Sequence, residues 1–183
     1  MSLSTSGNGN NTSIEDDLLI FDDDDALCFV DDEASQDSVE MAPWNVLIVD
    51  DDEDVLLVTQ LAFSGLEVLG RPIHLIHAHS FQSAQEILST QDCAVVITDA
   101  IMETEDAGLR LIDWVSHQQV FFATRLVLRT GQPGRFQENV ILRDYKIHDY
   151  WPKTELTASR MRTILMGLIR SYQDIQSLIQ PVA

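Results

Sequence analysis

The chain has 183 residues, of which 45% are hydrophobic, and its formal net charge at pH 7 is -19. So acidic a chain lacks the basic patch that nucleic acids require, and we expect no direct nucleic-acid binding. The sequence shows no apolar run of membrane-spanning length and no signal-peptide pattern, so we expect a cytoplasmic protein without a membrane segment. The two cysteines, Cys28 and Cys93, lack the spacing of metal ligands or of a redox pair, so we expect reduced thiols.

The first 42 residues form an acidic segment that we expect to be mostly disordered. Residues 1–40 contain twelve acidic residues and no Lys or Arg, and residues 1–13 are mainly Ser, Thr, Gly and Asn. Such a composition buries too little apolar surface to offset the entropy of ordering. Residues 15–33 alternate apolar blocks with aspartate clusters, which is typical either of a segment that docks on a partner protein or of a solvated linker. We place the folded domain at 43–183.

The folded part alternates between short apolar runs and amphipathic segments. Continuous apolar runs predict parallel strands that are covered by helices on both faces. Strands that alternate with helices at this spacing predict an α/β fold with right-handed crossovers. The predicted strands are residues 46–49, 73–78, 94–98, 126–128 and 148–151, and the predicted helices are residues 54–63, 81–88 with Ser80 as N-cap, 109–115, a weak one within 132–146, and about 157–179.

Two of these helices carry patterns that predict contacts. The first has an apolar face that should be buried against the sheet: Val55, Leu56, Val58, Leu61 and Ala62. The last has a heptad seam, with spacings of four and three residues: Met161, Leu165, Leu168, Tyr172, Ile175 and Ile179. A heptad seam favours a helical contact between two chains or a signalling helix. The alternative is that its first half packs on the sheet and its last turns fray.

Polar residues with useful chemistry follow the predicted strands. Asp50 and Asp51 follow the first strand, Asp99 the third and Thr130 the fourth, and Lys153 lies just beyond the fifth. The carboxyl ends of parallel strands meet at one edge, so these residues should converge there. Converging carboxylates repel one another unless a divalent cation binds, and oxygen ligands favour Mg²⁺ or Mn²⁺. The hydroxyl and the ammonium group could hold phosphoryl oxygens, so we interpret Asp99 as a nucleophile that accepts a phosphoryl group.

From about Trp44 to Tyr172, the chain resembles the receiver domain of two-component response regulators. The resemblance implies a doubly wound, flavodoxin-like α/β fold, in which a five-stranded parallel sheet of order 2-1-3-4-5 has helices on both faces. It rests on four motifs: VLIVDDDEDV at 46–55, TDAIMETEDAGLRL at 98–111, LVLRTGQPG at 126–134 and HDYWPKTELT at 148–157.

The resemblance also assigns roles to the residues at the strand ends. It implies that Asp99 is the phosphoacceptor and that Asp51 binds Mg²⁺ (or Mn²⁺) directly. Asp50 would contribute through a water molecule, and the backbone carbonyl of Ile101 would complete the protein ligands.

Three further residues match the parts of a receiver that respond to phosphorylation. Thr130 resembles the switch hydroxyl that moves to the phosphoryl group, and Lys153 resembles the ammonium group that contacts it. Tyr150 resembles the aromatic residue whose rotamer changes with that movement.

Departures from the usual receiver pattern point to a subgroup. The loop at 102–108 is one residue longer than usual and lacks its proline, and Lys153 follows Pro152 instead of preceding a proline. These two departures, together with the motifs RTGQPG at 129–134 and KTELT at 153–157, resemble a subgroup of receivers. Members of that subgroup are fused to a sensor-like domain and then to an HD-GYP phosphodiesterase, a GGDEF cyclase or a kinase module. None of these modules is in this chain, so we expect either a stand-alone regulator or an excised receiver.

The resemblance implies a signalling role. The domain would take a phosphoryl group from a histidine kinase or a phosphotransfer protein and change the face formed by its fourth helix, fifth strand and fifth helix. It would act as an enzyme only in phosphorylating itself from small donors and in dephosphorylating itself. That second reaction should be slow, because the apolar side chain of Ile101 cannot orient water.

Two other functions remain open from the residues. One is a Mg²⁺-dependent phosphohydrolase, although such enzymes usually place an Asp-x-Asp nucleophile after the first strand. The other is a degenerate receiver that only docks proteins.

Overall fold

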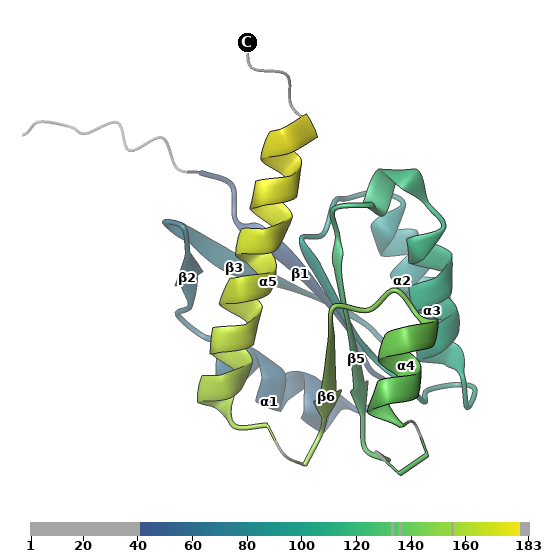
Figure 1. Ribbon diagram of the computed structural model, residues 1–183. Coiled ribbons are helices and arrows are strands. Elements are labelled where there is room, and N and C mark those ends of the chain that lie inside the picture. Colours follow the sequence, from purple (N-terminus) through teal and green to yellow (C-terminus); the bar gives the residue numbers. More distant parts are fainter. Residues whose placement is uncertain (1–40, 133, 136, 155, 180–183) are drawn as a thin grey trace, which may run out of the picture. The chain divides into compact units, whose positions relative to one another are not determined.

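The computed structural model describes residues 41–179 except 133, 136 and 155. The acidic segment 1–40 lies outside the described residues, so its disorder, its docking role and the domain boundary near residue 43 stay predictions. The elements are β1 (Trp44–Val49), α1 (Glu53–Phe63), β2 (Glu67–Val68), β3 (Arg71–Ala78), α2 (Phe81–Leu88), β4 (Val95–Asp99), α3 (Ala107–Ser116), a 3₁₀ turn (Gln119–Phe121), β5 (Arg125–Thr130), α4 (Glu138–Asp144), β6 (Asp149–Pro152) and α5 (Ala158–Ile179) (Figure 1).

The sheet has six strands in the order β2-β3-β1-β4-β5-β6. Its five long strands are parallel and follow the predicted order 2-1-3-4-5, which is confirmed. The predicted count of five is wrong, because β2 adds an antiparallel pairing beside β3. Leu69 (φ 53°) and Gly70 (φ 72°) form the two-residue turn between β2 and β3, and positive φ at both positions suits a tight hairpin. The sequence lacks the usual Asn-Gly signal at this turn, so the hairpin was not predicted.

Helices cover both faces of the sheet, as predicted. Figure 1 shows α1 and α5 on one face and α2, α3 and α4 on the other. Because side chains alternate along a strand, β1 sends Val46 and Ile48 into the core under α1 and α5, and Leu47 and Val49 into the opposite core. All four are fully buried, which explains why the strand reads as a continuous apolar run.

The short helix α2 begins and ends where the sequence predicts. The Ser80 hydroxyl accepts a hydrogen bond from the Ser83 backbone N–H at 3.2 Å, and the Ser83 hydroxyl accepts one from the Ser80 N–H at 3.1 Å. This reciprocal pair is a capping box. The predicted N-cap at Ser80 is confirmed.

The predicted buried face of α1 is partly wrong. Leu56 and Ala62 are buried, but Val58 is 63% and Leu61 66% exposed. Thr59 is buried instead, because its hydroxyl donates to the Val55 carbonyl at 2.7 Å and accepts a hydrogen bond from a buried arginine of β5. The buried face of α1 therefore includes a polar residue that hydrophobicity alone does not predict.

The long helix α5 packs on the sheet through its first half. Met161, Leu165 and Leu168 are buried, whereas Leu178 is 85% and Ile179 48% exposed. The first half of the seam therefore serves the core, and a contact between chains through the second half stays a prediction. In the part of the chain that the structure describes, no helix has the length and apolar character needed to cross a membrane.

Candidate functional site

The strand ends bring the predicted site residues to one edge of the sheet. Asp50 directly follows β1, Asp99 ends β4, Thr130 ends β5 and Lys153 directly follows β6. These strands are parallel, and β4 lies between β1 and β5. Asp99 therefore occupies the middle of the edge, with the other residues on either side of it.

Lys153 joins two of the carboxylates. Its Nζ lies 2.8 Å from Asp99 Oδ2 and 3.0 Å from Asp50 Oδ2. Asp50 is fully buried and Asp99 is 7% exposed, so these contacts form largely out of water. Burial by itself would lower the pKa of Lys153, but the two carboxylates outweigh it and raise that pKa. The ammonium group therefore stays charged at neutral pH.

Asp99 is held in a defined orientation. Lys153 binds its Oδ2, and the backbone N–H of Ala100 donates to its Oδ1 at 2.8 Å. Burial and then the negative charge of Asp50 raise the pKa of Asp99, and the Lys153 and Ala100 contacts only partly oppose them. The carboxylate therefore lies where additional positive charge would stabilise it.

Three carboxylates at this edge could hold a cation. One oxygen from each of Asp50, Asp51 and Asp99 lies within 4.8 Å of the others, the one such group found among the described residues. Asp50 and Asp99 are buried and Asp51 is exposed, so the group is open on one side. An oxygen-only donor set with an open side favours Mg²⁺ or Mn²⁺, which keep several water ligands, over zinc.

An arginine that the sequence reasoning missed completes the charge arrangement. Arg129 Nη2 donates to Asp50 Oδ2 at 2.8 Å, and its Nη1 donates to the Thr59 hydroxyl at 2.7 Å. Arg129 is buried. A charged residue in the buried run LVLRT signals a buried counter-charge, because an unpaired buried charge is very costly. That signal could have found the pair.

The long loop after Asp99 is tied to neighbouring elements. Glu103 Oε1 accepts a hydrogen bond from the Phe81 backbone N–H at 3.0 Å, at the start of α2. Glu105 forms an ion pair with Arg135 in the segment that follows Thr130. The two glutamates of METED thus link this loop to α2 and to the loop after β5.

The two predicted switch residues lie on the same face of the sheet. Leu128 of β5 pairs with Tyr150 of β6, and Thr130 follows Leu128 by two residues. Thr130 is 1% exposed, and its hydroxyl accepts a hydrogen bond from the Gln132 N–H at 3.0 Å. Tyr150 is 6% exposed, so its side chain already lies within the core.

His74, His79 and the described cysteine lie in ordinary surroundings. His74 Nδ1 lies 3.0 Å from Asn45 Oδ1, and His79 Nδ1 lies 3.8 Å from Glu53 Oε1. Cys93 is buried, and burial followed by the charge of Asp92 raises the pKa of its thiol to about 12. Such a thiol is unreactive near neutral pH. Cys28 lies outside the described residues.

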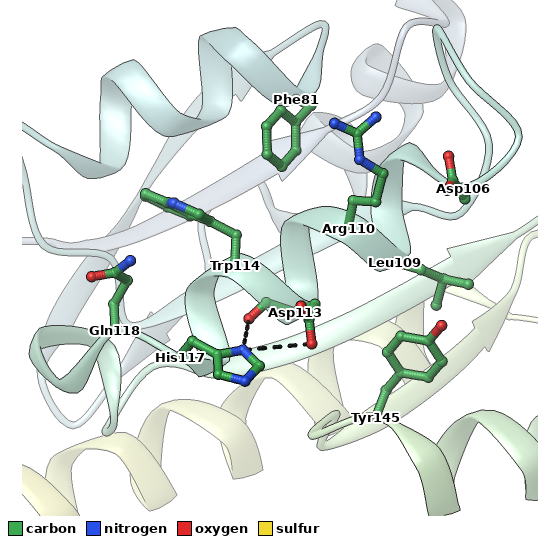
Figure 2. A pocket seen from close by; sticks show the side chains of 9 residues that line it. All are labelled: Phe81, Asp106, Leu109, Arg110, Asp113, Trp114, His117, Gln118 and Tyr145. Carbon is green, nitrogen blue, oxygen red and sulfur yellow. Dashed lines mark hydrogen bonds and ion pairs between the residues drawn. The ribbon is translucent and has the colours of Figure 1, made fainter.

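Two pockets lie near these elements. A pocket of about 610 Å³ contains none of the clustered carboxylates, and Figure 2 shows its wall on α3 with Phe81 and Tyr145 facing it. A pocket of about 220 Å³ adjoins the site through Lys153 and Arg129, and its other walls are mostly apolar. The 610 Å³ pocket is lined by Phe81, Asp106, Leu109, Arg110, Asp113, Trp114, His117, Gln118 and Tyr145.

Comparison with known proteins gives a sequence relative. No family model matches the chain. The 3′3′-cGAMP-specific phosphodiesterase 2 of Vibrio cholerae is 41% identical over 134 residues, which cover 73% of this chain. The chain spans about a quarter (26%) of that relative's length.

Solved structures match most of the chain. A signal receiver domain of an HD domain-containing protein from Pseudomonas fluorescens is 20% identical, with a TM-score of 0.61, over 74% of this chain and 93% of that one. The chemotaxis response regulator CheY4 of Vibrio cholerae is 16% identical, with a TM-score of 0.54, over 69% and 98%. The Mn²⁺-bound form of the response regulator Rcp1 is 15% identical, with a TM-score of 0.52, over 77% and 98%. The chain therefore has the fold of response-regulator receiver domains.

Proposed function

We propose that this chain is a receiver that accepts a phosphoryl group on Asp99 and changes the behaviour of an output. The observation that carries the proposal is the contact between Lys153 Nζ and Asp99 Oδ2 at 2.8 Å, beside Asp50 and Asp51 at the carboxyl edge of the sheet. A buried carboxylate fixed next to an ammonium group, within a cluster that fits a divalent cation, has the parts that phosphoryl transfer needs.

The reaction follows from these parts. An oxygen of the ionised Asp99 carboxylate attacks the phosphorus of a phosphohistidine on a partner kinase or phosphotransfer protein. A phosphorus–oxygen bond forms, the phosphorus–nitrogen bond breaks, and the imidazole leaves with the bonding electron pair. Lys153 binds the phosphoryl oxygens as the carboxylate's negative charge moves onto them, so the chain contributes mainly positioning and charge neutralisation.

The residues of the site also suit a divalent cation. Asp51 and Asp99 would bind Mg²⁺ or Mn²⁺ directly, with the Ile101 carbonyl, and Asp50 would contribute through water. When bound, the cation neutralises negative charge on the phosphoryl group and orients it.

We expect phosphorylation to act through the Thr130 hydroxyl. This hydroxyl would leave its hydrogen bond with the Gln132 N–H and donate to a phosphoryl oxygen. Tyr150 lies on the same face of the sheet, so the shift would change the packing around its ring. The surface formed by α4, β6 and α5 would then alter its affinity for an output.

Labelling with a small phosphodonor tests the assignment. The protein is incubated with Mg²⁺ and acetyl phosphate, and intact mass and free phosphate are followed. A single added phosphoryl group that is absent from Asp99→Asn, but present in the exposed control Asp113→Asn, supports the receiver. Continuous phosphate release would indicate a phosphohydrolase. If the folded protein is not labelled at all, the remaining interpretation is a degenerate receiver that only docks proteins.

The sequence relative favours one class of output. Because that relative is a 3′3′-cGAMP-specific phosphodiesterase, we propose that this receiver controls a cyclic-dinucleotide phosphodiesterase. A chimera tests this, in which this chain replaces the matching quarter of the Vibrio enzyme. Hydrolysis of 3′3′-cGAMP should change when beryllofluoride and Mg²⁺ are added, and a chimera with Asp99→Asn should not respond. An active chimera that ignores beryllofluoride would contradict the proposal.

The second half of α5 is our proposed homodimer contact. Leu178 and Ile179 are exposed, and Ile175 is only half-buried. Sedimentation of the protein with and without beryllofluoride should reveal a dimer that Ile175→Glu abolishes. A monomer at all concentrations in both states would contradict this contact.

A further inference from the structure

Arg129 brings a second positive charge to the carboxylate cluster from within the sheet. It extends from β5 past the end of β4 to Asp50, which follows β1. Both side chains are buried, with exposed fractions of 6% for Arg129 and 0% for Asp50. A second hydrogen bond, from Nη1 to Thr59, anchors the guanidinium group to α1. Its two Nη atoms are therefore held between α1 and the carboxylate, whereas the buried Nε has no hydrogen-bond partner among the described residues.

These contacts restrict what Asp50 can offer to a cation. Asp50 Oδ2 already lies 2.8 Å from Arg129 Nη2 and 3.0 Å from Lys153 Nζ, so two positive groups share it. Oδ1 accepts the Asp52 backbone N–H at 3.0 Å. A carboxylate oxygen can accept about two hydrogen bonds, so Oδ1 keeps one free direction and Oδ2 keeps none. Asp50 can thus reach a cation through a water molecule on Oδ1 without breaking the pair.

The guanidinium group also changes the charge of the site. Asp50, Asp51 and Asp99 with Lys153 alone would carry two net negative charges, and Arg129 reduces that to one. A fixed positive charge close to a cation site opposes binding of a doubly charged ion. The opposition is strong here because both partners of the pair are removed from water.

We propose that Arg129 is a positioning residue that holds Asp50 as an outer ligand and keeps the affinity of the site for divalent cations low. The inference rests on the proposed function of the site and adds a regulatory property to it. With low affinity, occupancy of the site follows the free concentration of the cation, and phosphoryl transfer becomes sensitive to that concentration. The resulting phosphoryl group would itself increase occupancy, because it adds negative charge.

Two substitutions separate charge from structure. Arg129→Gln keeps a hydrogen-bond donor but removes the charge, and Arg129→Lys keeps the charge. Calorimetric titration with Mg²⁺, and electron paramagnetic resonance of free Mn²⁺, should show about tenfold tighter binding to Arg129→Gln. Arg129→Lys should bind Mg²⁺ and Mn²⁺ with the same affinity as the unaltered protein. A purely structural role predicts weaker or unchanged binding in both variants, and either result in folded protein would overturn the proposal.

A measurement on the unaltered protein covers the case in which Arg129→Gln does not fold. Because its Nη atoms donate to Asp50 and Thr59, the Arg129 guanidinium group should rotate slowly and give separate ¹⁵N-bound Nη proton resonances. These resonances should persist at saturating Mg²⁺, because Asp50 stays paired. Their collapse on Mg²⁺ binding would show that the cation displaces Arg129, which contradicts the proposal.

The same experiments distinguish this inference from the proposed function. If acetyl phosphate labels Asp99 and Mg²⁺ binds, but Arg129→Gln binds no more tightly, only the role of Arg129 fails. If Arg129→Gln binds Mg²⁺ more tightly but Asp99 is never labelled, the role of Arg129 holds and the assignment of Asp99 as phosphoacceptor is contradicted. If the unaltered protein binds no divalent cation, both fail.

Discussion

A Cβ atom placed on Gly108 would lie 1.8 Å from the carbonyl oxygen of Asp99 and 2.7 Å from its carbonyl carbon. The first turn of α3 thus packs directly on the end of β4, where the Gly108 N–H donates to the Ala100 carbonyl at 3.2 Å. No other residue fits this contact without a shift of backbone. The glycine of the DAGLRL motif therefore helps to define the position of Asp99.

We expect Gly108→Ala to lower the free energy of unfolding by about 3 kcal/mol, because backbone atoms must separate to admit the methyl group. It should also weaken acetyl-phosphate labelling, since Asp99 would move. Urea denaturation and labelling measure both effects. Gly167→Ala in α5 is the control: nothing lies within 4 Å of its Cβ, and removing a helical glycine should stabilise the protein by up to about 1 kcal/mol. Equal stabilities for the two variants would contradict the close contact.

The glutamates of the METED loop should differ in their contribution to stability. Glu103 accepts the Phe81 N–H at the positive end of α2, so Glu103→Ala should lower the free energy of unfolding by about 1 kcal/mol. Glu105 is 76% exposed in its ion pair with Arg135, and exposed pairs contribute little, so Glu105→Ala should change stability by less than about 0.5 kcal/mol. Urea denaturation of both variants tests this. A larger loss of unfolding free energy in Glu105→Ala than in Glu103→Ala would contradict this ranking of the two glutamates.

His148 should make stability depend on pH. Its Nδ1 accepts the Leu126 N–H at 2.9 Å, and burial followed by the charge of Arg125 lowers the pKa of His148 to about 4 from 6.5. The folded protein therefore keeps this ring neutral, while the unfolded chain gains a proton as the pH falls below 6.5. The contribution of the neutral His148 ring to the free energy of unfolding is complete above about pH 6.5 and is lost progressively as the pH falls towards 4.

We expect the titration of His148 to lower the free energy of unfolding by about 1 kcal/mol between pH 7 and pH 5. Part of the ring is exposed, and solvent makes the effect smaller than the pKa shift alone would give. His148→Asn keeps an acceptor for the Leu126 N–H but cannot titrate. Urea denaturation at both pH values should show a smaller loss in this variant than in the unaltered protein. An identical loss in both would exclude His148 as the cause.

Ile101 should prolong the phosphorylated state. It lies two residues after Asp99, and its half-buried side chain cannot orient an attacking water molecule. We expect Ile101→Asn to shorten the lifetime of the aspartyl phosphate roughly tenfold, because its amide can bind that water. Decay of labelled protein after removal of acetyl phosphate measures the lifetime. Ile101→Leu is the control, and an equal lifetime for Asn and Leu would contradict this role.

Much of the fold follows from local patterns. The three central strands β1, β4 and β5 are marked by apolar runs because both of their faces are buried, and α2 is marked at its start by Ser80. The hairpin of β2 and β3 was missed because Leu69-Gly70 gives little turn signal. The buried face of α1 was partly misassigned because hydrophobicity could not indicate that Thr59 faces Arg129.

The sequence by itself determined which residues stand at the strand ends, because strand period and parallel connection bring Asp50, Asp99, Thr130 and Lys153 to one edge. Only the tertiary structure decided how their charges pair. Arg129 and Asp50 are 79 residues apart in the chain, and their ion pair forms because β1 and β5 flank β4. The charged residue in the buried run LVLRT indicates that a counter-charge is needed, but which carboxylate supplies it depends on which side chains meet across the sheet.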